Sequence, residues 1–144
     1  MISKAKKEDF LIVAKLAKEL WNNHSLVDLE NEFKEYLFSD NVCIYIDYEN
    51  NVPVAFAQVS LRYEYVEGVN SSPVAYLEGV FVKEEYRRQN IAQQLITKCE
   101  DWAKEKKCKE MASDCELENE ISYKFHLKSG FKECNKIICF TKKL

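Results

Sequence analysis

The chain has 144 residues, a formal net charge of −3, and 47% hydrophobic, 31% charged and 12% aromatic residues. This length and composition suit one folded domain over residues 1–144, and three glycines with two prolines leave little room for long linkers. The acidic balance argues against a general affinity for nucleic acid, whereas acids that converge in one place would suit a cationic ligand.

The cysteines and histidines argue against a metal site. Six cysteines occur without a CxxC pair, and only two histidines accompany them. The opening "MISKAKKEDF" lacks the apolar core of a signal peptide, and no apolar run reaches membrane length. We therefore expect a cytoplasmic protein with reduced thiols and with no membrane or nucleic-acid partner.

The N-terminal half is expected to fold as a short strand, two helices and a strand pair. Residues 1–5 form the first strand candidate, and apolar residues recur at helical spacing in 6–21 and 28–39. The period then changes to the alternation typical of strands in 41–48 and 52–65, which a short polar turn separates.

The C-terminal half alternates strands with helices. We expect a strand at 75–82, a strongly amphipathic helix at 91–107, a short buried strand at 109–117 and a helix at 119–129. A last hairpin is expected at 131–144. The order β-α-α-β-β-β-α-β-α-β(β) predicts a mixed α/β (α+β) fold, with a central sheet of six to seven strands and about four helices on its faces.

The stretch "YRRQNIAQQL", residues 86–95, combines two arginines with a helix start. Unpaired N–H groups and the helix dipole make such a start an anion site, and Arg87 and Arg88 add full positive charges. Glycine usually allows close approach of a phosphate here; Asn90 tolerates the left-handed conformation instead, and Ala92 is small. From chemistry alone, a solvated basic helix cap explains the stretch equally well.

Two motifs together resemble the GCN5-related N-acetyltransferase (GNAT) family. "VFVKEEYRRQNIAQQLITKCEDWA" is similar to its acetyl-CoA-binding segment, whose R/Q-x-x-G-x-G/A pattern reads here as residues 87–92. Downstream, Asn119, Ser122, Phe125 and His126 with "HLKSGF" resemble the family's second signature. The resemblance covers essentially the whole chain, and it implies the GNAT fold, mostly antiparallel, with a bulged strand at the cofactor cleft.

Within this family the chain resembles the aminoglycoside 6'-N-acetyltransferases, in "SSPVAYLEGVFV", "ASDCELEN", "KFHLKSGF" and "IICFTKKL". The resemblance implies acetyl-CoA as co-substrate, no metal, and direct transfer to a primary amine of an aminoglycoside antibiotic, which confers resistance. The implied cofactor-binding residues are Val80, Phe81, Val82, Arg87, Arg88, Gln89, Asn90, Ile91, Ala92, Gln93, Asn119 and His126. His126 replaces the tyrosine that often serves as the general acid in the family, and a structural role for it is the alternative.

Two carboxylates are the candidates for proton transfer and substrate binding. Glu78 lies beside Gly79, where a glycine in a strand suggests a bulge, and Asp114 ends the neighbouring strand. Together they could hold a cationic amine and accept its proton, directly or through water, while the N–H of Val82 polarises the thioester carbonyl. The alternative is that both acids only form ion pairs or cap turns.

The resemblance also implies that Trp21 and Tyr65 flank the acceptor's sugar rings and that Asn135 stands where the subgroup often has another acid. It further suggests a homodimer, and "KIICF" is an apolar candidate for pairing at a sheet edge. Two other functions remain open: acetylation of another small amine or of a protein amine, and a non-catalytic acyl-CoA-binding sensor.

Overall fold

The computed structural model describes all residues, 1–144. The elements are, in chain order, β1 (Ile2–Lys4), η1 (Lys7–Asp9), α1 (Phe10–Leu20), α2 (Leu26–Tyr36), β2 (Val42–Glu49), β3 (Val52–Arg62), β4 (Val74–Val82), η2 (Glu84–Tyr86), α3 (Ile91–Glu105), β5 (Met111–Ala112) and α4 (Glu120–Lys128).

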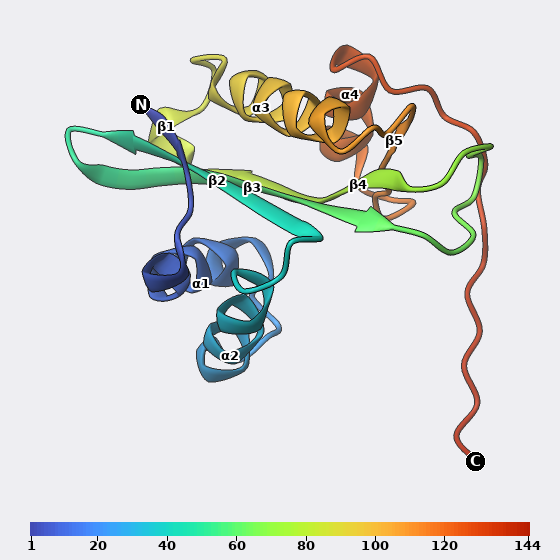
Figure 1. The fold of residues 1–144 in the computed structure, drawn as a ribbon, viewed down its shortest axis with the longest axis horizontal. Helices are drawn as coiled ribbons and strands as arrows, with labels where there is room; N and C mark the ends of the chain where they lie inside the picture. Colours follow the sequence, from blue (N-terminus) through green and yellow to red (C-terminus); the bar gives the residue numbers. More distant parts are fainter.

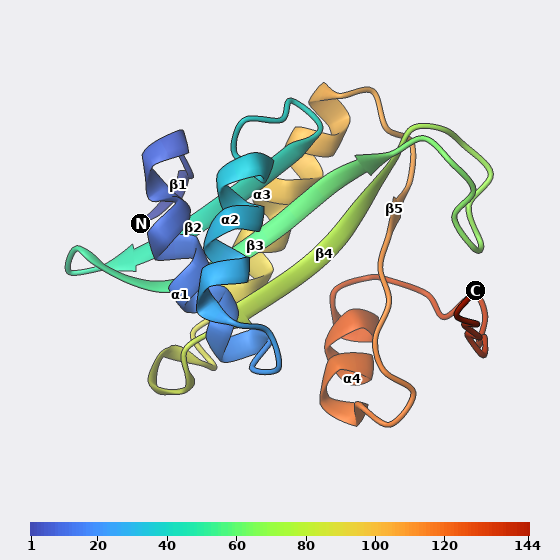
Figure 2. The same ribbon diagram turned by 90° about the horizontal axis from the view of Figure 1, so that it is seen from below.

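One sheet separates two helical layers. Its strands lie in the order β1-β2-β3-β4-β5, antiparallel except for the parallel pair β4–β5. Helices α1 and α2 cover one face and α3 covers the other, with α4 beside β5 (Figures 1 and 2). The predicted mixed α/β class with four helices is therefore confirmed.

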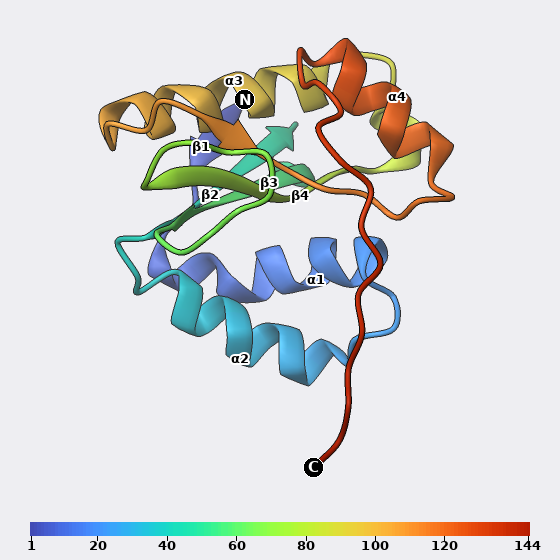
Figure 3. The same cartoon turned by 90° about the vertical axis from the view of Figure 1, so that its right-hand side faces the viewer.

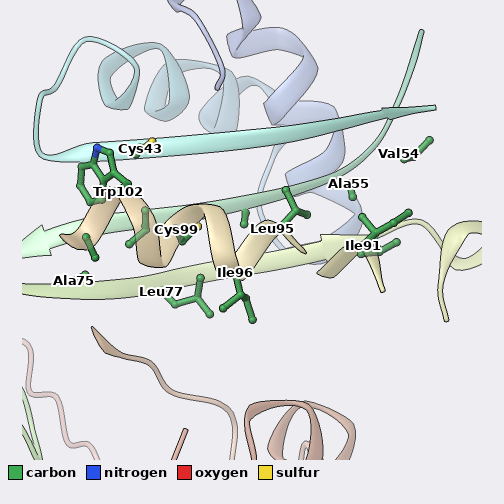
Figure 4. Close-up of a cluster of buried hydrophobic side chains, with 14 residues drawn as sticks. Cys43, Val54, Ala55, Ala75, Leu77, Ile91, Leu95, Ile96, Cys99 and Trp102 are labelled. Carbon is green, nitrogen blue, oxygen red and sulfur yellow. The ribbon is translucent and has the colours of Figure 1, made fainter. Parts of the chain in front are cut away.

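Each face of the sheet has its own apolar core. On the α3 face, Leu95, Ile96 and Cys99 are fully buried against the strands, at the spacing that gives a helix one apolar side (Figure 4). On the other face, Phe33 of α2 packs against Phe56 of β3 with ring centroids 6.3 Å apart. Each such buried side chain stabilises the fold by about 1.5–3 kcal/mol, so both faces hold the strands in register.

The strand count was predicted too high. The sheet has five strands rather than six or seven, β5 has only two residues, and residues 131–144 form neither helix nor strand. The C-terminal segment leaves α4 and runs past the open side of the molecule, away from the sheet (Figures 1 and 3). The predicted hairpin at 131–144 is thus wrong for the isolated chain, because a strand needs a neighbour and Ile137, Ile138 and Phe140 have none.

Candidate active site

A bulge in β4 sets the geometry of the site. Gln58 of β3 pairs with Gly79, but the next residue, Val59, pairs with Leu77, so Glu78 is the extra residue. The bulge that was predicted at Gly79 is therefore confirmed. The shift also changes which side chains face α1 and α2: Tyr76, opposite Ser60, shares that face with Gln58.

A cleft of about 380 Å³ opens between this face of the sheet and helices α1 and α2. Its lining combines aromatic rings with acidic and other polar groups, contributed by Trp21, His24, Leu29, Glu32, Phe33, Tyr36, Gln58, Ser60, Arg62 and Glu78. Burial, then the nearby carboxylates of Glu32 and Glu78, raise the pKa of Tyr36 above its usual value. Glu32 and Glu78 thus place two carboxylates in the same cleft as aromatic rings, and this combination favours a cationic ligand.

The Glu78 carboxylate is held by Arg62. The guanidinium donates from Nε to Oε1 at 3.1 Å and from Nη2 to both oxygens at 2.9 Å. The same guanidinium stacks 3.4 Å above the Tyr76 ring, and the Tyr76 hydroxyl donates to Asp114. Burial and then the hydrogen bond to Asp114 raise the pKa of Tyr76 well above its usual value, so this tyrosine stays a donor. One continuous chain of contacts therefore joins the two predicted carboxylates.

Arg62 was not among the site residues predicted from the sequence. Near the end of a long strand, an arginine usually points to solvent, and nothing in its neighbours suggests an ion pair. Strand alternation does place Arg62 on the same face as Gln58 and Ser60. Combined with the predicted bulge beside Glu78, that alternation was the one signal in the sequence that could have identified the ion pair between Arg62 and Glu78.

Trp21 lines the cleft and lies beside Gly79 of β4. A Cβ on Gly79 would lie 2.7 Å from Cζ2 of the Trp21 indole, so the ring rests directly on the glycine backbone. The indole also stacks near Phe33, at 6.5 Å and 13° between ring planes, and meets Phe56 edge-on at 6.1 Å. The absence of a side chain at position 79 therefore serves the close approach of an aromatic ring to the strand.

Most of β4 has no neighbour on the side away from β3. β5 pairs only with Ala75 and Tyr76, after which the two strands diverge. The Lys83 N–H donates to Val54 at 2.9 Å, so by antiparallel alternation the N–H groups of Val80 and Val82 point to this open edge. Main-chain donors are thus exposed in a row next to the bulge.

The turn into α3 continues that row of donors. Arg88 and Asn90 both have a left-handed backbone with φ of 63°, which confirms the left-handed conformation expected at Asn90. The first helical hydrogen bond runs from the Gln94 N–H to Asn90 O, so the N–H groups of 91–93 precede it and have no acceptor in the helix. Arg87 turns back instead, donating from Nε to Val82 O at 2.8 Å. The turn therefore offers main-chain donors and the Arg88 charge, while Arg87 braces the loop.

His126 and Asn119 make contacts within the fold. The Nδ1 atom of His126 lies 2.7 Å from Ser122 O, and Nε2 lies 2.7 Å from Ser113 Oγ. Because a carbonyl only accepts, Nδ1 carries the proton and Nε2 accepts from the serine when the ring is neutral. Asn119 caps α4 by accepting from the Ser122 N–H at 3.0 Å. Both residues position α4 beside the open edge of β4, and their predicted contact with the cofactor stays a prediction.

Tyr65 and Asn135 both bind Glu67, and neither of them lines the cleft. The hydroxyl of Tyr65 and the amide of Asn135 each donate to the Glu67 carboxylate at 2.6 Å. Their two hydrogen bonds lower the pKa of Glu67 below its usual value. The structure thus groups these two residues away from Trp21 and Glu78, and their role at an acceptor stays a prediction.

No group of three or more histidine, cysteine, aspartate or glutamate side chains converges as a metal site would require. None of the helices combines the length and apolar character needed to span a membrane. The six cysteines are all free thiols.

Comparison with known proteins decides the family. Residues 10–131 match the model of the acetyltransferase (GNAT) family. The chain belongs to this family. The GNAT resemblance seen in the sequence is therefore confirmed, and binding of the cofactor at the open edge of β4 stays a prediction.

Several proteins named as acetyltransferases are similar over most of the chain. The aminoglycoside N(6')-acetyltransferase type 1 of Acinetobacter baumannii is 38% identical over 99% of this chain and 96% of its own length. The enzyme of the same name from Salmonella typhimurium is 39% identical over 89% of this chain and 88% of its own. The aminoglycoside N-acetyltransferase AAC(6')-Iy in complex with CoA superposes with a TM-score of 0.96 at 36% identity, covering 100% of this chain and 95% of that one.

Proposed function

We propose that this protein transfers the acetyl group of acetyl-CoA to the 6'-amine of aminoglycosides, by direct attack in a ternary complex, and so confers resistance to them. The observation that carries the proposal is the meeting of two half-sites at the β4 bulge. Free main-chain donors line one side, and a cleft with aromatic and acidic walls opens on the other. The similar enzymes named above, one also solved with a bisubstrate analogue, CoA-S-monomethyl-acetylneamine, support it.

The residues on the cofactor side fit acetyl-CoA. The N–H of Val80 suits a carbonyl of its pantetheine arm, and the N–H of Val82 suits the thioester carbonyl that it would polarise. The free N–H groups before Gln94, together with Arg88, suit its pyrophosphate. When bound, acetyl-CoA supplies an activated acetyl group as a thioester. The protein's contribution is to hold the reacting groups in line, which can supply several kcal/mol of the rate enhancement, roughly 7–11 in favourable cases.

The residues on the acceptor side fit a polycation. Glu78 lies at the bulge, so its carboxylate is next to the place where the two half-sites meet. Because Arg62 already binds both of its oxygens, a substrate ammonium must share or displace that guanidinium. We propose that Glu78 and Asp114, which are joined through Arg62 and Tyr76, bind the amine and receive its proton, directly or through water.

The deciding experiment measures thiol release from acetyl-CoA with a panel of acceptors. Kanamycin-type and tobramycin-type aminoglycosides should be turned over, with acetylation at the 6'-nitrogen located by NMR of the product. Spermidine and a lysine peptide serve as controls and should react at least about 100-fold more slowly in kcat/KM, since a site built for hydrogen bonds rejects analogues that lack them. Turnover of the peptide alone would overturn the proposal, and a rise in Tm with acetyl-CoA without turnover of any amine would identify a sensor.

We also propose that the protein is a cytoplasmic homodimer. The C-terminal segment supports a dimer because Ile137, Ile138 and Phe140 are 65%, 81% and 87% exposed, and a monomer rarely leaves such a run uncovered. The short β5 leaves a sheet edge to which an apolar extended segment can add. A cytoplasmic location agrees with the six free thiols.

Analytical ultracentrifugation tests the dimer. The intact chain should sediment as a dimer at micromolar concentration, and Ile138→Lys should shift it towards the monomer. Lys142→Glu, a charge change in the same segment outside the apolar run, should leave the dimer intact. A wild-type monomer at all concentrations would overturn this part of the proposal without affecting the proposed reaction.

A further inference from the structure

The core contains one buried polar side chain that the fold does not explain. Only Asp47 and Gln58 among the polar and charged residues are buried, at 3% and 5% exposure. Asp47 is paired with the amino group of Met1 at 2.9 Å. Gln58 lines the cleft, its amide bonds to no other protein group, and that amide is not sealed away from the cleft. The fold does not use this amide, so it is free to bind a ligand that enters the cleft.

The neighbours of Gln58 indicate the chemistry of the ligand that enters the cleft. Gln58 is directly opposite Gly79, on which the Trp21 indole rests, and Glu78 is the next residue along β4. An aromatic ring, a carboxylate and a primary amide therefore line the same cleft. The flat ring suits the C–H face of a sugar, the carboxylate suits an ammonium group, and the amide can both donate to and accept from a hydroxyl.

From this arrangement we infer that Gln58 is a specificity-determining residue that binds the ring hydroxyl nearest to the acetylated amine, the 4'-hydroxyl of the acceptor's amino sugar. The inference rests on the proposed function and deepens it, since it names the hydroxyl group of the acceptor that Gln58 recognises. Its consequence is selection of hydroxylated amino sugars over simple aliphatic amines, because an amine without the hydroxyl leaves the amide unpaired.

Two acceptors that differ at this hydroxyl make the test. Tobramycin keeps the 4'-hydroxyl, whereas 3',4'-dideoxykanamycin B lacks it and is otherwise the same molecule. The wild type should favour tobramycin by about tenfold or more in kcat/KM, which is the range for a lost hydrogen bond that leaves a partner unsatisfied. Gln58→Met keeps the length of the side chain and removes its polar atoms, so it should lower kcat/KM for tobramycin to the level of the dideoxy compound and abolish the preference.

A matched control separates recognition from folding. Gln94→Met makes the same substitution at an exposed position of α3 and should keep the wild-type preference. Gln58→Met should have a Tm close to that of the wild type, because the amide forms no hydrogen bond within the protein and faces the cleft. A Gln58→Met protein that keeps the tobramycin preference would overturn the inference, and so would one that loses stability and activity towards both acceptors in parallel.

Failure of the proposed function gives a different result. If the wild type acetylates neither compound, calorimetry measures the binding of the same two acceptors to the wild type and to Gln58→Met. A tobramycin preference in binding that disappears with Gln58→Met supports the role of Gln58 although acetylation fails. Equal binding of both acceptors by the wild type overturns it.

Discussion

The two halves of the site are built from different parts of the polypeptide. The cofactor half consists of main-chain donors on the open edge of β4 and in the first turn of α3. The acceptor half consists of side chains, with Glu78 fixed by Arg62 and Trp21 resting on Gly79. A main-chain site depends on backbone conformation and tolerates changes of residue, so it can function with Asn90 where glycine is usual. A side-chain site depends on particular functional groups and should lose activity with almost any exchange.

The largest effect is expected where a charge of the acceptor half is removed. Glu78→Gln should lower kcat/KM for an aminoglycoside by about 10²–10⁴, the range for a lost proton-transfer group, and leave Arg62 as an uncompensated cation against a cationic substrate. Part of the loss should return at high pH, where the amine is already neutral. The Tm shift caused by acetyl-CoA should remain that of the wild type.

Glu32→Gln is the matched control, since Glu32 is the other carboxylate of the cleft and forms no ion pair. It should reduce kcat/KM by no more than about tenfold, as loss of one surface charge typically does. Asp114→Asn should lie between the two, because Asp114 reaches Glu78 only through Tyr76 and Arg62. Equal losses for Glu32→Gln and Glu78→Gln would show that only the summed charge matters.

The next effect concerns shape in the acceptor half. In Gly79→Ala the new Cβ would lie 2.7 Å from Cζ2 and 2.9 Å from Cη2 of Trp21, so the indole must move. We expect a loss of about 1–3 kcal/mol in the free energy of unfolding, together with a higher KM for the aminoglycoside.

Gly130→Ala provides the comparison by denaturant unfolding and kinetics. Its Cβ would meet nothing within 4 Å, but the φ of +93° is unfavourable for alanine. It should therefore cost stability without changing the KM of the acceptor. If Gly79→Ala keeps the wild-type KM for the aminoglycoside, Trp21 does not contribute to binding of the acceptor.

Tyr76→Phe tests the contact that joins Glu78 to Asp114, and its expected effect is smaller than those above. Losing the hydrogen bond to Asp114 should cost about 1 kcal/mol of stability at neutral pH. Burial, followed by that hydrogen bond, raises the pKa of Tyr76 in the folded protein, so folding holds this proton more tightly than the unfolded chain does. The resulting stability is fully present below the ordinary tyrosine pKa of about 10, and it is lost as the pH rises above that value.

Thermal unfolding between pH 8 and 11 measures this difference. The gap in Tm between the wild type and Tyr76→Phe should be constant up to about pH 10 and then narrow. Tyr123→Phe, at a partly exposed position of α4, should run parallel to the wild type. If the difference in Tm stays constant up to pH 11, the raised pKa of Tyr76 does not contribute to the stability of the folded protein.

The same division explains what the sequence could predict. The cofactor half follows from local signals: a strand, two arginines, an asparagine suited to positive φ and an amphipathic helix are contiguous along the chain. The acceptor half requires the pairing of β3 with β4, because the bulge at Glu78 decides that Tyr76 rather than Leu77 lies opposite Ser60. Arg62 and Gln58 were missed for this reason, since their partners lie across the sheet rather than nearby in sequence.

The C-terminal error has a related cause. Residues 136–140, "KIICF", have strand-like composition, but whether they form a strand depends on a neighbour that composition does not specify. The chain offers them no partner of its own, so they remain extended and exposed. Non-local pairing therefore limits the prediction of the sheet edge in the same way as it limits the prediction of the acceptor half.

The smallest effect is expected in the cofactor half, where only the backbone should matter. Asn90 adopts a φ of 63° and its side chain makes no capping hydrogen bond to α3. Asn90→Gly removes the steric cost of that conformation but adds flexibility to the unfolded chain, so stability should change by less than about 1 kcal/mol. Because the N–H donors keep their directions, acetyl-CoA binding should be unchanged or tighter, and the KM of the aminoglycoside should not change.

Asn90→Ala sharpens this test, because alanine fits the left-handed region poorly and should cost about 1–2 kcal/mol and weaken acetyl-CoA binding. Isothermal titration with acetyl-CoA measures both variants against the wild type. If the cofactor half is a main-chain site, affinity follows backbone preference, with glycine at least equal to asparagine and alanine below both. A large loss of affinity in Asn90→Gly would instead show that the amide of Asn90 binds the cofactor directly, and the contrast between a main-chain half and a side-chain half would then fail at this turn.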